Sequence, residues 1–167
     1  MNMKKLMLII LYGFCCLDGF SQTTAIAEPA YKRIPTIPPF TLALVPDSVS
    51  FSKENLKKKR AVIVMIFSPD CDHCVHATED LIKNINLFRK VDIVMVTSLS
   101  FASEQKFYTD LHIAAHKNIH VGFDRERFLS SFYEVRNFPS IYLYDKKGNF
   151  KEAFEGSVSF EKIAKSL

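Results

Sequence analysis

The sequence predicts an α/β protein in which helices flank a central mixed β-sheet. Residues 61–67 are an unbroken apolar run of strand length, and a second, mostly apolar segment of strand length follows at 91–97. Between them, residues 74–88 repeat apolar or small side chains at the spacing of one helix face. A strand, a helix and a strand joined by short connections form a right-handed unit in which the two strands are parallel. The lack of alternation in residues 61–67 is typical of a strand in a sheet that is covered on both faces.

The N-terminus has the pattern of a secretory signal peptide. Two lysines precede a mostly apolar run at 6–17, which is too short to span a bilayer comfortably. Small residues at Gly19 and Ser21 then suit a cleavage site. We therefore expect residues 1–21 to be removed by cleavage after Ser21. The alternatives are a second cleavage site at residues 25–27, lipidation at Cys15 or Cys16, and an uncleaved membrane anchor.

Removal of that segment leaves enough residues for one domain with a sizeable core. The formal net charge of the whole chain is +4, so the protein is weakly basic. The basic run at 57–60 has no aromatic residues interleaved with it, so we expect a solvated loop and no nucleic-acid partner. No apolar run in the rest of the chain is long enough to span a membrane. We therefore expect an exported protein, in the periplasm or outside the cell, with no membrane span in its mature form.

The mature chain begins with a segment, residues 22–37, that we expect to be a flexible linker. It combines prolines with small and polar residues and shows no helical or strand period. The domain itself is expected over residues 38–167. Its first elements are a short edge strand at 40–44 and a turn with a short helix at 50–56.

The elements after the second long strand complete the predicted sheet and its helices. A helix, a short strand and a short helix come first, and a β-hairpin and a final helix follow. Their expected ranges are 102–113, 119–123, 125–133, 140–144, 150–154 and 157–167. Gly148 lies in the turn between the last two strands and can take a positive φ there.

Cys71 and Cys74 carry the chemistry that we expect. They are the only cysteines after residue 21, and they lie where the first long strand passes into a helix. A helix N-terminus favours an anion, and the thiolate is the form of cysteine that attacks disulfides. We expect Cys71 to be the exposed nucleophile and Cys74, one turn inside, to be buried and to resolve the mixed disulfide. A static structural disulfide is the alternative.

Asp72 and His73 stand between the two cysteines and are candidates for redox tuning. A protonated imidazole at His73 would stabilise a thiolate on Cys71. Asp72 acts in the opposite direction through like-charge repulsion. An equally weighted interpretation makes both residues solvent-exposed members of a turn. Structural zinc usually needs a second Cys/His pair, and no further cysteine follows Cys74, so we expect no metal.

These residues, with two later features, resemble the thioredoxin superfamily, and most closely the exported TlpA/DsbE-like thiol–disulfide oxidoreductases and related redoxins. A strand leads into residues 67–74, which contain the C-x-x-C motif. Residues 137–140 open a later strand, where the family has its cis-proline, and residues 143–149 form the turn between the last two strands. The resemblance covers about residues 38–167 and implies a thioredoxin-like fold with an N-terminal extension.

The resemblance also implies partners and further site residues. It implies a cis bond between Phe138 and Pro139, with both residues facing a bound partner. It implies exchange with protein thiols and disulfides and with an upstream redox partner, without a diffusible cofactor. Two positions depart from the family: Asp70 replaces the common tryptophan, and Met65 replaces the buried acid of reducing thioredoxins. The direction of exchange therefore stays open, with reduction favoured by the resemblance alone.

Two other functions on the same fold are less favoured. Thiol peroxidases of the peroxiredoxin type carry a P-x-x-x-[TS]-x-x-C signature. Ser68 would supply its hydroxyl, but Val64 stands where its proline belongs. A copper-binding metallochaperone would use Cys71, Cys74 and a histidine. Copper-delivering relatives have C-x-x-x-C spacing, however, and this chain has C-x-x-C.

Overall fold

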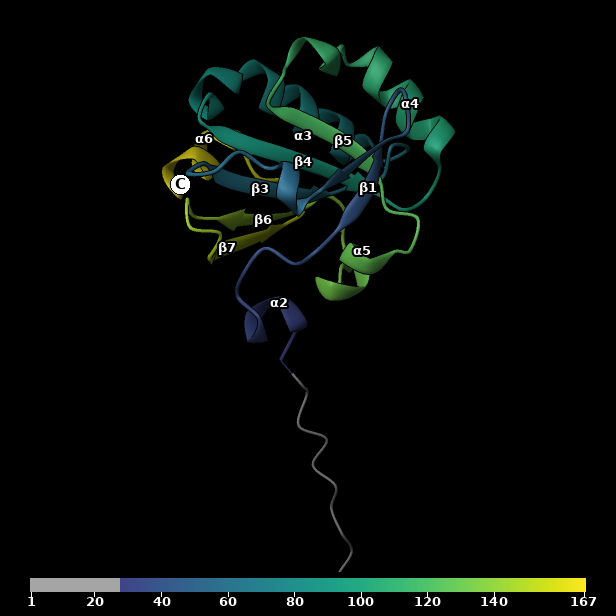
Figure 1. Ribbon diagram of the computed structural model, residues 1–167. Coiled ribbons are helices and arrows are strands. Elements are labelled where there is room, and N and C mark those ends of the chain that lie inside the picture. The colour runs from purple at the N-terminus through teal and green to yellow at the C-terminus, as the bar shows by residue number, and fades with distance from the viewer. Residues whose placement is uncertain (1–27) are drawn as a thin grey trace, which may run out of the picture.

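A computed structural model describes residues 28–167 and shows a seven-stranded mixed β-sheet with helices on both faces (Figure 1). The strands follow the order β2-β1-β5-β4-β3-β6-β7 across the sheet. They are β1 (Thr41–Leu44), β2 (Val49–Ser52), β3 (Ala61–Ile66), β4 (Val91–Thr97), β5 (Ile119–Phe123), β6 (Ser140–Tyr144) and β7 (Phe150–Glu155). The predicted signal peptide lies outside the described residues.

Five α-helices and three 3₁₀ turns accompany these strands in the described part of the chain. The α-helices are α2 (Ala30–Arg33), α3 (Asp72–Lys83), α4 (Phe101–Asp110), α5 (Phe128–Phe132) and α6 (Phe160–Lys165). The 3₁₀ turns are η1 (Lys53–Asn55), η2 (Ile85–Phe88) and η3 (Ile113–Ala115). Within residues 28–167, no helix has both the length and the hydropathy that crossing a bilayer requires.

The β3–α3–β4 unit confirms the predicted parallel pair at the centre of the sheet. Ala61 lies opposite Val91 and Ile66 opposite Val96, and β4 is also parallel to β5. Every residue of β3 and β4 is buried, as expected for strands covered on both faces. The carboxyl ends of β3, β4 and β5 therefore lie at one edge of the sheet, which we call the carboxyl edge.

Alternate residues of β3 belong to two separate hydrophobic layers. Ile63 and Met65 pack in a cluster that includes residues of α3, α4 and α6. Val62 and Val64 pack in a second cluster that includes residues of α5 and, from α2, Tyr31. Figure 1 shows the corresponding arrangement, with α3 and α4 on one side of the sheet and α2 and α5 on the other.

The described part of the expected flexible linker, residues 28–37, is packed against the domain. It contains α2, and the ring of Tyr31 lies 5.2 Å from the ring of Tyr142 and 5.3 Å from that of Phe150. The backbone N–H of Phe150 donates a 2.8 Å hydrogen bond to the carbonyl of Pro35. The N–H of Ile37 donates a 3.0 Å hydrogen bond to the carbonyl of Gly148, and Ile37 itself is buried. These contacts hold a segment that has no sequence period against the domain.

The N-terminal hairpin also differs from the expectation. The segment expected as an edge strand forms β1, but β1 lies inside the sheet between β2 and β5. Residues 50–56, expected as a turn with a short helix, contain most of β2 and the single turn η1. Phe51 explains the strand, because its side chain is buried opposite Leu42 and stacks on His120 at 4.5 Å between ring centroids.

The later elements confirm the predicted order and correct several ends. The strands at 119–123 and 140–144 have the expected bounds. The central helix starts at Asp72, two residues earlier than expected, and gives way to η2 after Lys83. Helix α4 ends at Asp110, and His112 beyond it adopts a left-handed conformation with φ 52°. Arg127 also adopts a left-handed conformation, with φ 54°, so α5 begins at Phe128 and not at residue 125 as expected.

Candidate functional site

Cys71 occupies the N-cap position of α3, at the carboxyl edge just beyond β3. Its N–H donates to the carbonyl of Ser68 (3.2 Å). Its own carbonyl accepts the N–H groups of Cys74 (2.9 Å) and Val75 (3.1 Å). The residue is half-buried, which leaves part of it in contact with solvent. It therefore lies at the positive end of the helix dipole, where a thiolate is favoured.

Cys74 lies one turn inside the helix and has no solvent exposure. It packs in the same hydrophobic cluster as Met65 and Phe67. Thr78 Oγ1 donates a 2.8 Å hydrogen bond to the carbonyl of Cys74, within the same buried face of α3. Burial raises the pKa of the Cys74 thiol to about 12, and the neighbouring Cys71 adds to the shift. Both cysteines are free thiols, and Cys71 is more exposed to solvent than Cys74, as expected.

Asp72 and His73 lie in the first turn of α3 and are both exposed. In the described residues no hydrogen bond joins either side chain to a thiol. The carbonyl of Asp72 lies 2.8 Å from Nδ1 of His76, one turn further along the helix. Any effect of these two side chains on Cys71 therefore acts through space, where solvent weakens it.

Phe138 and Pro139 lie beside the end of β3. The peptide bond between them is cis, which confirms that prediction. Ser140 pairs with Ile66, the last residue of β3, so Pro139 enters the sheet at the carboxyl edge. The N–H of Gly156 donates a 2.8 Å hydrogen bond to the Pro139 carbonyl. Pro139 is buried, whereas Phe138 is 36% exposed and presents an aromatic ring to solvent.

Glu104 is a buried titratable group that the sequence analysis missed. Its side chain has no solvent exposure, and neither carboxylate oxygen has a hydrogen-bond partner in the described residues. Burial raises the pKa of this carboxyl to about 8, because the charged form loses its hydration. Phe101 and Phe107 lie three residues before and three residues after Glu104 on the same helix. That spacing places Glu104 on the apolar face of the helix, and it was the signal in the sequence that could have indicated its burial. Phe107 in turn lies 4.8 Å from the ring of Phe67.

The position of the family's buried acid is occupied by Met65, which is fully buried in the cluster that holds Cys74. In residues 28–167 no group of three or more Cys, His, Asp or Glu side chains is arranged to hold a metal ion.

Comparisons with known proteins agree with this fold. A family model described as a thioredoxin-like domain matches residues 50–167. Among solved structures, a secreted disulfide oxidoreductase of Mycobacterium tuberculosis, described as homologous to E. coli DsbE, is 15% identical with a TM-score of 0.64. That match covers 76% of this chain and 92% of the other.

Two further solved structures have similar scores. The exposed lipoprotein thioredoxin Etrx1 of Streptococcus pneumoniae is 21% identical, with a TM-score of 0.63, and the match covers 78% of this chain and 100% of the other. StoA of Bacillus subtilis is 19% identical, with a TM-score of 0.58 and coverage of 79% and 98%. No curated protein matches the sequence. At these identities the structural likeness shows the fold alone.

Proposed function

Because the chain belongs to the thioredoxin-like domain family, we propose that it is an exported thiol–disulfide oxidoreductase that exchanges a dithiol for disulfides in partner proteins. The observation that carries the proposal is the unequal placement of two cysteines on one helical turn. Cys71 is half-exposed at the N-cap of α3, and Cys74 is wholly buried. The structural neighbours support thiol–disulfide chemistry in general, and the cysteine geometry supports this assignment of roles.

The exchange proceeds in two displacements. The thiolate of Cys71 attacks one sulfur of a partner disulfide, so that a mixed disulfide forms and the other partner sulfur leaves as a thiolate. The sulfur of Cys74 then attacks Cys71, which closes the disulfide between them and releases the second partner sulfur. The partner gains two electrons and the two protons that the dithiol gives up. An upstream redox partner would return the protein to the dithiol state.

The second displacement requires removal of a proton from Cys74, because its thiol is protonated at neutral pH. Burial raises the pKa of its thiol to about 12, so its proton must leave as it attacks. The departing partner sulfur can accept that proton without a further protein group. The same burial keeps Cys74 away from solvent oxidants and from a second partner, and Cys71 remains the point of entry.

Phe138 and Pro139 supply the surface on which a partner would lie. Both precede β6 at the carboxyl edge, beside the end of β3 that leads to Cys71. The exposed ring of Phe138 offers apolar contact to a partner segment. Proline has no backbone N–H, so it does not compete with the partner chain for hydrogen bonds at this point.

Export is the part of the proposal that rests on the sequence. The pattern of residues 1–21 predicts cleavage after Ser21, and an oxidising compartment is where disulfide exchange has substrates. N-terminal sequencing or intact mass of the exported protein tests this. A mature N-terminus at Gln22 is expected, and retention of residues 1–21 would mean a membrane anchor.

The activity itself is tested by reduction of insulin disulfides with dithiothreitol as the electron source. The protein should accelerate precipitation of the insulin B chain, and Cys71→Ser should abolish that acceleration. The same samples should be titrated with Cu(I). No acceleration, together with tight binding of Cu(I) that requires both cysteines, would overturn the redox proposal in favour of the copper alternative.

A further inference from the structure

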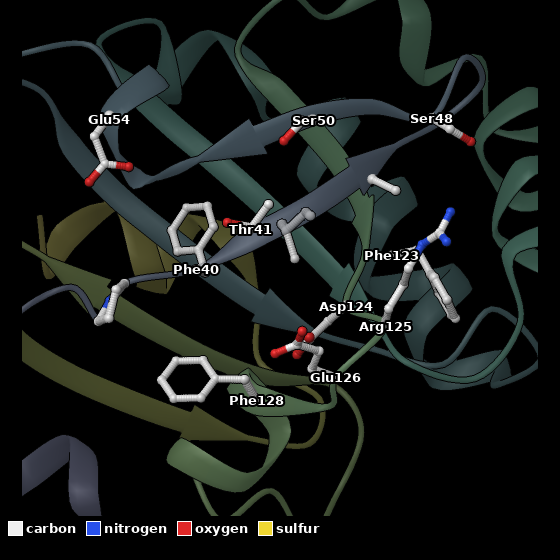
Figure 2. Close-up of a pocket in the computed structure, with 13 residues that line it drawn as sticks. Phe40, Thr41, Ser48, Ser50, Glu54, Phe123, Asp124, Arg125, Glu126 and Phe128 are labelled. Carbon is white, nitrogen blue, oxygen red and sulfur yellow. The ribbon is translucent and has the colours of Figure 1, made fainter.

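A groove with a volume of about 640 Å³ opens beside the β1–β2 hairpin (Figure 2). Its lining includes three phenylalanines, Phe40, Phe123 and Phe128, and three acidic residues, Glu54, Asp124 and Glu126. Figure 2 shows the carboxylates of Asp124 and Glu126 close to each other in this view, with the ring of Phe40 to their upper left and that of Phe128 to their lower left. The mechanism described above uses none of these residues.

The groove lies on the same carboxyl edge as the dithiol. Asp124 directly follows β5, Cys71 lies five residues beyond the end of β3, and the intervening strand β4 is parallel to both strands. Neighbouring strands lie about 4.8 Å apart, so two strand spacings place the ends of β3 and β5 roughly 10 Å apart across the sheet. Leu99 follows β4 between them and is 52% exposed. An exposed apolar side chain therefore marks the path from Cys71 to the groove.

Exposed apolar side chains concentrate along this edge. Six large hydrophobic residues are exposed in the described part of the chain, and three of them adjoin the carboxyl edge or the groove that opens from it. Phe138 lies at the start of β6, Leu99 at the end of β4, and Phe128 beyond β5 in the lining of the groove. In the strand order β6, β3, β4, β5, Phe138 thus lies on one side of Cys71 and Leu99 and Phe128 on the other, so exposed apolar side chains flank the dithiol along this edge.

The charge of the groove specifies what its occupant should carry. Glu54 and Glu126 are exposed acids of the lining, and Arg125 is its only base. Asp124 is buried and accepts the N–H of Leu129 at 2.8 Å. The groove is thus net acidic, although the chain as a whole carries a formal charge of +4. A cation is the complement of such a groove, and aromatic rings add a cation–π attraction.

We propose that the groove binds a basic residue of the partner polypeptide, three to five positions from the partner cysteine that reacts with Cys71. An extended chain advances about 3.3 Å per residue, so about three residues cover the two strand spacings between the ends of β3 and β5, and one or two more allow for the loops beyond them. The inference rests on the proposed function, because it adds a recognition element to the same exchange reaction. Leu99 would contact the intervening part of the partner segment.

A pair of matched peptides tests the proposal. Each peptide carries one cysteine in a disulfide with thionitrobenzoate, so that attack by Cys71 releases a coloured thiol. One peptide has Lys four residues from its cysteine and the other has Gln, and each is made with that residue on either side. Ion pairs and cation–π contacts at exposed sites predict a rate about three- to tenfold higher for the lysine peptide on one side. The preference should fall as salt is added.

Substitutions in the groove should remove this preference. Glu126→Gln and Phe128→Leu are expected to bring the two peptide rates together, each rate being divided by the same variant's rate with glutathione disulfide. Glu152→Gln is the matched control, because Glu152 is an exposed acid on β7. Strand β7 is the outermost strand on the side of the sheet away from the β1–β2 hairpin. The Glu152→Gln variant should keep the full lysine preference. Equal rates for the two peptides with the unaltered protein would overturn the proposal, as would a preference that survives Glu126→Gln unchanged.

A redox-inert peptide separates this proposal from the proposed function. With Ser in place of its cysteine, the lysine peptide should still bind more tightly than the glutamine peptide, and binding should shift the NMR signals of Phe40 and Phe128. Equal binding of the two inert peptides would overturn the groove assignment. Failure of glutathione disulfide to react would count against the exchange activity, and the inert peptides would still decide whether the groove binds a basic residue.

Discussion

The backbone N–H of Cys74 donates a 2.9 Å hydrogen bond to the carbonyl of Cys71, so both cysteines belong to the first turn of α3. Within that turn one residue is half-exposed and the other has no exposure at all. Two chemically identical groups thus differ in access to solvent and to partners. This asymmetry gives the proposed exchange a fixed order and leads to the predictions that follow.

The two thiols should differ in their rate of alkylation. Burial raises the pKa of Cys74 to about 12, so at pH 8 only about one molecule in ten thousand carries its thiolate. Iodoacetamide should therefore modify Cys71 first, and Cys74 only after the protein unfolds. Peptide mapping by mass spectrometry after short exposures measures this order. Equal labelling of both cysteines in the folded protein would contradict the assignment.

Glu104→Gln should stabilise the protein in a pH-dependent way. The folded-state pKa of Glu104 is raised from its usual 4.5 to about 8, so ionisation opposes folding. The variant should match the unaltered protein near pH 4 and gain stability as the pH rises from about 4.5 to 8. The gain above pH 8 should be on the order of a few kcal/mol.

Thermal or urea unfolding across that pH range measures the effect of Glu104. Glu152→Gln removes an exposed acid from β7 and should leave the pH dependence unchanged. A difference in unfolding free energy between Glu104→Gln and the unaltered protein that stays constant from pH 4 to 9 would mean that the carboxyl does not titrate in this window.

Phe138→Ala should slow exchange with protein disulfides. The ring is 36% exposed beside the cis-proline at the carboxyl edge, so truncation removes partner contact. We expect insulin reduction to fall about two- to tenfold, with a change in unfolding free energy within about 0.5–1 kcal/mol. Leu87→Ala is the control, because Leu87 is 56% exposed on η2, before β4 and away from its carboxyl end. An equal loss of activity in both variants would indicate a general effect of surface truncation.

Tyr31→Ala should show that the N-terminal segment is part of the folded domain. Its ring contacts Tyr133, Tyr142 and Phe150 at centroid distances of 5.2–5.9 Å. Aromatic pairs contribute about 0.5–1.5 kcal/mol each beyond buried area, so the substitution should cost about 2 kcal/mol of unfolding free energy. Ile34→Ala, at a 56% exposed position nearby, should cost little. Equal melting temperatures for Tyr31→Ala and the unaltered protein would mean that α2 is not held by these contacts.

The central part of the fold could be predicted because its signals are local and strong. The run at 61–67, the helical spacing after Cys74 and the run at 91–97 together specify the βαβ unit. That unit places the dithiol at a helix N-terminus whatever the rest of the chain does. The order of the two cysteines in the site follows from the same pattern, without any tertiary information.

The peripheral elements depend on contacts that a local pattern does not contain. Strand β2 exists because Phe51 is buried beside β1, and β1 can approach β5 because Gly122 has no side chain. A Cβ added there would lie 2.8 Å from the Cβ of Leu42. The packing of Tyr31 and the burial of Glu104 likewise depend on residues far away in the sequence. These are the places where the structure corrects or extends the sequence-based expectations.

The most direct measurement of the central claim is the capture of mixed disulfides by single-cysteine variants in cells that export the protein. Cys74→Ser should accumulate covalent complexes with partner proteins through Cys71, because no thiol remains to resolve them. Cys71→Ser should capture few, because the remaining thiol at position 74 is buried. Mass spectrometry of the captured chains would identify the partners. Equal capture by the two variants, or none by either, would contradict the proposed order of attack and the function built on it.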